Sequence, residues 1–195
     1  MQVEKPSKKT QDRTNAAVPH QSKIQVLVLT GLLTALVFVV TRFLGIPVAD
    51  GWLNLGDSSI AASALLLNHP LVALAAGLGS ALSNLTSGHL IFAPATFVIK
   101  GTMGLVLYFF ARKGRFSFFA LGVFLAELIM VVGYTAYIFL LVDIGSFASI
   151  PGNLFQAAAN FALALLLYYP LVKLRKALWG GVDVPLASPA DKSTR

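Results

Sequence analysis

Runs of apolar residues long enough to cross a membrane recur along most of the chain, and short polar breaks separate them. A membrane-spanning helix needs about 20 mainly apolar residues. The pattern therefore predicts an all-α, polytopic membrane protein with six transmembrane helices, of which the second is short. The expected helices span 23–46, 56–68, 70–87, 94–111, 116–142 and 152–175.

Helix-breaking residues set several of these boundaries. Gly45 and Pro47 end the first segment. Pro70 suits the first turn of the third segment, and Pro94 opens the fourth. The third segment, 70–87, is rich in alanine and glycine, which allow neighbouring backbones to approach closely. We therefore expect this helix to lie at the centre of the bundle.

The composition agrees with a membrane protein. Hydrophobic residues make up 56% of the chain and charged residues only 12%, whereas soluble domains carry about 25% charged residues. The chain contains no cysteine, which excludes disulfides and thiolate chemistry. Its three histidines are far apart in sequence, so nothing in their spacing indicates a metal site.

The basic residues predict the orientation. They fall in the polar tails 1–22 and 176–195, at Lys23, in the turn 112–115 and at the end of the sixth helix, leaving only Arg42 and Lys100 elsewhere. Basic residues favour the cytoplasmic side. We therefore expect both termini in the cytoplasm and a membrane domain over 23–175. Topology and lipid contact explain the net charge of +7, so we expect no nucleic-acid partner.

In this orientation the loops 47–55, 88–93 and 143–150 lie outside. Polar residues in or beside them are candidates for ligand binding, because an unpartnered polar group in hydrocarbon is costly. They include Asn54, Asp57, His89 and Asn153. Asp57 has a second interpretation, since Asp57 or Ser58 can cap the second helix.

Lys100 and Glu127 lie deeper. Each is 12 residues from the basic turn, so an antiparallel hairpin places both about 18 Å from it. We predict that they face each other or share a ligand or a water. The alternative is a buried ion pair that only fixes the packing.

The sixth helix carries a polar stripe. Asn153, Gln156 and Asn160 are spaced i, i+3 and i+7 on one face. We expect Gln156 to contact a ligand, and Asn160 to make an interhelical hydrogen bond. Trp52 is either an interfacial anchor or part of the site.

Five motifs in order resemble those of a known family, the substrate-binding S components of energy-coupling factor (ECF) vitamin transporters of the riboflavin type. The motifs are Leu53–Asp57 at the start of a short helix, GLGSALSNLTSGH at 77–89, APATFVIKGTMGL at 93–105, ELIMVVGY at 127–134 and IPGNLFQA at 150–157.

The resemblance implies a subunit of a bacterial cell membrane that captures a vitamin outside. It implies assembly with a T transmembrane subunit and two cytoplasmic ATPases, which use the ATP, so this chain needs no cofactor and is not an enzyme. In the family, an Ala-x-x-x-Ala face of the first helix docks on the T subunit. This chain has Gly31 and Ala35 at these positions.

The expected ligand is a small pyrimidine or pyridine, such as hydroxymethylpyrimidine or a B6 vitamer, with riboflavin or cobalamin as alternatives. Two other hypotheses compete with this one. A self-sufficient ion-coupled carrier would use Lys100 and Glu127 as a proton relay. An intramembrane enzyme would use Glu127 or Asp57 as an acid or a base. The ligand-contacting residues expected in the vitamin transporter are Trp52, Asn54, Asp57, Asn84, His89, Lys100, Glu127, Tyr134, Asn153 and Gln156.

Overall fold

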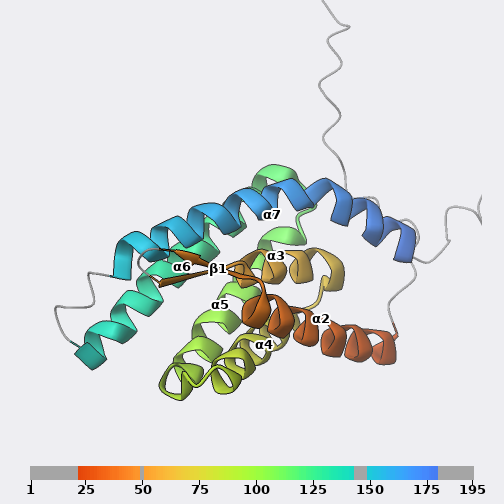
Figure 1. Cartoon of the computed structure of the whole chain (residues 1–195). Helices are drawn as coiled ribbons and strands as arrows, with labels where there is room; N and C mark the ends of the chain where they lie inside the picture. The colour runs from red at the N-terminus through yellow and green to blue at the C-terminus, as the bar shows by residue number, and fades with distance from the viewer. Residues whose placement is uncertain (1–21, 49–50, 143–148, 180–195) are drawn as a thin grey trace, which may run out of the picture.

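The computed structural model describes residues 22–48, 51–142 and 149–179 (Figure 1). In this part of the chain, six α-helices and a two-stranded hairpin follow one another. The elements are α2 (Lys23–Phe43), β1 (Gly45–Val48), β2 (Gly51–Asn54), α3 (Gly56–Leu67), α4 (Val72–Thr86), a short 3-10 turn η1 (Leu90–Phe92), α5 (Ala93–Ala111), α6 (Phe116–Val142) and α7 (Ile150–Trp179).

Four of the helical segments are long and apolar enough to cross a membrane. They are Lys23–Phe43, Leu90–Ala111, Phe116–Leu141 and Ile150–Leu178. Helices α3 and α4 are apolar but have only 12 and 15 residues, which correspond to about 18 and 22 Å against a hydrocarbon core of about 30 Å. The chain is a helical membrane protein, and the count of six full spans stays a prediction.

The first helix ends earlier than expected. A capping box between Ser22 and Gln25 begins α2 at the predicted place, but the helix stops at Phe43 rather than at 46. The chain then turns into the antiparallel hairpin, in which Gly45 is opposite Asn54 and Pro47 is opposite Trp52. The segment expected to be a loop therefore begins as a pair of strands, which returns the chain to the N-terminus of α3.

Helix α3 is the buried centre of the bundle. Leu66 is its only residue that is not buried. In Figure 1, α7 runs along one side of α3, and α2, α4 and α5 lie on the other; α3 contacts all four. We expected α4 at this position. Because α3 is surrounded by protein, it can be shorter than the bilayer without exposing its backbone to lipid.

The small residues of α4 nevertheless do what their pattern predicted. A Cβ atom on Gly79 would come within 2.6 Å of the carbonyl oxygen of Thr34 in α2, and one on Gly77 within 2.8 Å of the carbonyl oxygen of Phe97 in α5. Gly104 of α5 is similarly close to the carbonyl oxygen of Val72. These glycines bring α4 into backbone contact with both neighbouring helices.

The α2–α4 contact yields a stability prediction. We expect Gly79→Ala to lower the free energy of unfolding by about 1–3 kcal/mol, because the new methyl group meets a backbone oxygen that cannot rotate away. The matched control is Gly31→Ala in α2, where no atom lies within 4 Å. That change should be neutral or stabilise by up to about 1 kcal/mol. Thermal unfolding in detergent would compare them, and equal effects would contradict the close contact.

Candidate functional site

The N-terminus of α3 is capped by side chains from outside the helix. The backbone N–H of Gly56 donates to Asn54 Oδ1 at 2.6 Å, and that of Ser58 donates to Asn160 Oδ1 of α7 at 2.9 Å. The first N–H groups of a helix have no partner within it. The prediction that Asp57 or Ser58 caps this helix is wrong, since the Ser58 hydroxyl instead donates to the carbonyl oxygen of Leu55.

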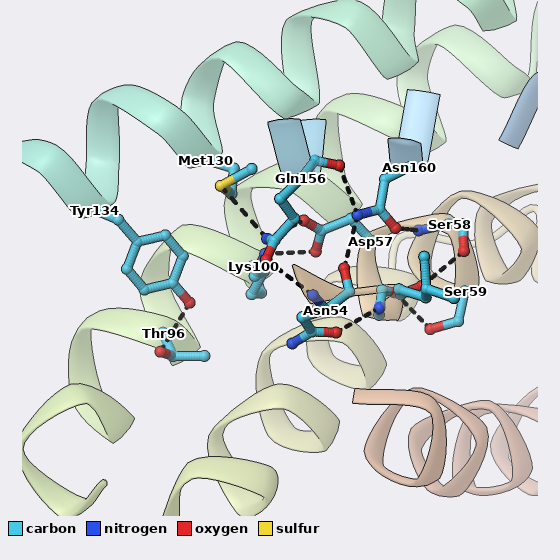
Figure 2. Close-up of polar contacts among 12 residues, drawn as sticks. Asn54, Asp57, Ser58, Ser59, Thr96, Lys100, Met130, Tyr134, Gln156 and Asn160 are labelled. Carbon is cyan, nitrogen blue, oxygen red and sulfur yellow. Dashed lines mark hydrogen bonds and ion pairs between the residues drawn. The ribbon is translucent and has the colours of Figure 1, made fainter. Parts of the chain in front are cut away.

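Asn160 connects α7 to this terminus through both ends of its amide. Its Nδ2 donates to the carbonyl oxygen of Asn54 at 2.7 Å and to that of Gln156 at 3.0 Å. The side chain is completely buried. The expected interhelical hydrogen bonding of Asn160 is confirmed (Figure 2).

Asp57, freed from capping, forms a buried ion pair with Lys100 of α5. The two residues are 2% and 3% exposed. Gln156 Nε2 of α7 lies 3.4 Å from the second carboxylate oxygen of Asp57, and the Lys100 ammonium lies 5.3 Å from the centre of the Tyr134 ring. Both charges therefore have partners, without which their burial would be prohibitively costly.

The structure shows no direct contact between Lys100 and Glu127, and the prediction that they share a ligand or a water stays untested. Glu127 is near enough for an electrostatic interaction with Lys100, but no hydrogen bond or ion pair joins the two in the described part of the chain. Glu127 is buried and lines a separate, apolar groove of about 260 Å³ between α6 and α7. Equal distance from the basic turn sets the depth of a residue but not the side of the helix on which it lies.

One member of the ion pair, Lys100, lines a cavity of about 540 Å³. Residues from the hairpin and from five helices surround it, at the end of the bundle where α2 and α4 end and where α5 and α7 begin. The lining residues are Thr41, Arg42, Asn54, Ser83, Asn84, Ser87, His89, Phe92, Lys100, Tyr134, Asn153 and Gln156.

Asn84, Thr96 and Tyr134 link three helices along the wall. Asn84 Nδ2 donates to Thr96 Oγ1 at 2.6 Å, and this hydroxyl lies 2.9 Å from the Tyr134 hydroxyl. Two buried polar atoms, Thr41 Oγ1 and Asn153 Nδ2, belong to lining residues and have no protein partner in the described segments. The cavity therefore has a braced polar wall, and two buried polar atoms of its lining residues lack a partner in the described segments.

Comparison with known proteins decides the family. The model of the family described as "ECF-type riboflavin transporter, S component" matches residues 21–174. The chain belongs to this family. It is also 34% identical, over 130 residues, to a protein of Pyrococcus woesei described as "Uncharacterized protein in gap 3'region", in a match that covers 66% of this chain and 87% of the relative.

Seven of the ten ligand-contacting residues expected in this S component line the cavity. They are Asn54, Asn84, His89, Lys100, Tyr134, Asn153 and Gln156. Asp57 lies behind Lys100 as its ion partner, and Glu127 faces the other groove. The side chain of Trp52 lies outside what the structure describes. A role of these residues in binding stays a prediction.

The sequence argument missed five lining residues. Ser83 and Ser87 flank Asn84 in or beside α4, Phe92 ends η1, and Thr41 with Arg42 lies in the last turn of α2. The sequence could have indicated Arg42, because Arg42 and Lys100 are the two basic residues that lie outside the predicted cytoplasmic segments. The others are ordinary helix residues whose facing depends on the packing.

The asparagines of α7 provide a matched pair of variants. Asn160→Ala removes the acceptor for Ser58 N–H and the donor for the Asn54 carbonyl, so we expect a loss of roughly 2–4 kcal/mol in stability. Asn153→Ala removes a side chain whose Nδ2 has no protein partner, and should change stability by less than about 0.5 kcal/mol. Chemical or thermal unfolding in detergent measures both; similar losses would refute the assigned cap.

The buried ion pair predicts coupled effects. Asp57→Asn and Lys100→Met should each cost about 3 kcal/mol, because each leaves one buried charge without its partner. The double variant should be clearly more stable than the sum of the two losses predicts. A double-mutant cycle on the free energy of unfolding makes the comparison. Additivity within about 0.5 kcal/mol would show that the pair is not coupled.

Proposed function

We propose that this S component captures a vitamin or vitamin precursor from outside the cell in the 540 Å³ cavity and delivers it with a T subunit and two ATPases. The observation that carries the proposal is a polar cavity at one end of a set of apolar helices, with its polar groups braced from several elements. A concave site with a few positioned polar groups is typical of small-molecule binding.

The orientation supports capture from outside. The cavity is bounded by the hairpin and by the start of α7, whereas the basic turn with Arg112, Lys113 and Arg115 joins α5 to α6 at the other end. Tyr168 near the C-terminal half of α7 donates to the carbonyl oxygen of Gly114 in this turn at 3.4 Å. Since basic turns favour the cytoplasm, the cavity opens on the outer face of a multi-pass protein of the cell membrane.

The cavity wall favours a flat heterocycle. Amides of Asn54, Asn84 and Asn153 can hydrogen-bond to ring substituents, and the rings of Tyr134 and Phe92 offer apolar faces. A small pyrimidine or pyridine, such as hydroxymethylpyrimidine or a B6 vitamer, is the preferred ligand. Riboflavin and cobalamin are the alternatives within the same function.

The docking face for the T subunit is proposed on α2. Gly31 and Ala35 are both exposed, and no atom of the described chain lies within 4 Å of a Cβ placed on Gly31. Small residues one helical turn apart allow another helix to approach closely. This supports the assignment of the Gly31-x-x-x-Ala35 face to contact with a partner helix.

The test is reconstitution. We expect the purified chain to bind a vitamin without transporting it, and liposomes that also contain the T and ATPase subunits to take up the vitamin only with ATP. Binding is measured by calorimetry against hydroxymethylpyrimidine, pyridoxine, riboflavin and cobalamin. Uptake by the lone chain would instead favour an ion-coupled carrier.

The Gly31→Leu variant is a second arm of this experiment. The larger side chain should leave vitamin binding by the isolated subunit unchanged, because Gly31 is remote from the cavity lining, but it should weaken co-purification with the T subunit. Gly31→Ala is the control, since its small side chain should preserve assembly. Loss of binding with assembly intact would overturn the docking assignment.

A further inference from the structure

The fold determines the direction of two amides at the cavity. A backbone N–H can only donate, so the atom that accepts from it must be the amide oxygen. Asn54 Oδ1 accepts from Gly56 N–H, and Gln156 Oε1 accepts from Asn54 N–H at 3.1 Å. The NH2 group of Asn54 is thereby left without a partner in the described segments, whereas that of Gln156 contacts the Asp57 carboxylate at 3.4 Å. In Figure 2 the Asn54 nitrogen points away from α3, toward Lys100 and Thr96.

Two cationic side chains of the wall can only donate. The Lys100 ammonium has three N–H groups and gives one to Asp57, and the Arg42 guanidinium has five. No aspartate or glutamate is among the described residues that line the cavity. Asn84 and Asn153 keep amide oxygens that can accept, so a ligand is not limited to acceptors. The permanent bias of the wall is nevertheless toward donors and positive charge.

Arg42 supplies the uncompensated charge. Lys100 is neutralised by Asp57, whereas Arg42 has no ion-pair partner within the described segments. Its guanidinium lies 5.3 Å from the ring centre of neighbouring Phe43, and its side chain is only half-buried. A cation in the last turn of a helix also complements the helix dipole. That contribution accounts for a basic residue at this end of α2 but not for its place on the cavity wall.

Building on the proposed function, we infer that Arg42 is a specificity-determining residue. The cavity takes a heterocycle that offers acceptors to Asn54 and Lys100 and carries an anionic group, a carboxylate or a phosphate ester, that Arg42 binds. Arginine suits this role because its planar fork matches two oxygens of such a group. No carboxylate lines the described wall, and the Asp57 carboxylate beside it is paired with Lys100, so such a ligand would meet little repulsion.

The experiment compares matched ligands that differ only in a phosphate ester. The pairs are pyridoxine with pyridoxine 5′-phosphate, riboflavin with riboflavin 5′-phosphate, and hydroxymethylpyrimidine with its phosphate, measured by calorimetry in a non-ionic detergent at pH 7.5. In the pair that binds, we expect the phosphate ester to bind about ten-fold more tightly, equivalent to about 1.4 kcal/mol. Arg42→Gln should abolish this difference by weakening the binding of the phosphate ester.

The control variant is Arg112→Gln, which removes an exposed arginine at the opposite end of the bundle and should preserve the preference. Equal or weaker binding of the phosphate ester, or an unchanged preference in Arg42→Gln, would overturn the inference while leaving the proposed function intact. An unchanged preference in Arg42→Gln is the result expected if Arg42 contacts only lipid headgroups. Failure of every compound to bind would contradict the proposed function, and this inference with it.

Discussion

The structure depends on burying the N-terminus of α3 inside a membrane protein. A helix N-terminus carries N–H groups that lack partners and a partial positive charge, and neither lipid nor apolar side chains can compensate them. This protein compensates them with Asn54 from the preceding hairpin and with Asn160 from α7, more than 100 residues further along the chain. The carboxylate of Asp57 lies in the first turn of α3, where a negative charge is also favourable.

The same arrangement prepares the cavity. Because Asn54 uses its amide oxygen on a backbone N–H group, its NH2 group remains for a ligand, whereas the NH2 group of Gln156 contacts Asp57. Because Asp57 pairs with Lys100, the ammonium is held at the cavity wall with N–H groups to spare. Folding and the proposed binding therefore share their polar residues, and a ligand would complete a network that the fold has already oriented. Such preorganisation lowers the cost of binding, since few side chains need to be ordered.

The central position of a 12-residue helix also explains the roles of its neighbours. Helix α3 is too short to cross the bilayer, so the hairpin covers its N-terminus, and the long helices shield its sides from lipid. The glycines of α4 and α5 let the surrounding helices close tightly around this arrangement. On the outer surface of α2, Gly31 and Ala35 leave a smooth face available to a partner. Membership of the S component family agrees with the proposed division between a binding cavity and an outer face of small residues.

Much of this protein was readable from the sequence by itself. Hydropathy determined the class, and Gly, Pro and basic turns placed α3, α5 and α6 within one residue of their observed ends, because these signals act over one or two helical turns. The motifs determined the family and most of the residues around the cavity. The hairpin was missed because the strand pairing from Gly45 to Asn54 is visible only once the two segments meet.

Partner choice was decided by the tertiary structure alone. The sequence places Lys100 and Glu127 at equal distance from a turn, but the rotation of each helix about its axis determines which side chains meet, and this turned Lys100 toward Asp57 and Glu127 toward another groove. The cap that Asn160 provides for α3 likewise joins residues 102 positions apart. Hydropathy and turn chemistry determine where helices lie along the chain, whereas the close packing of all six decides which polar atoms can reach one another.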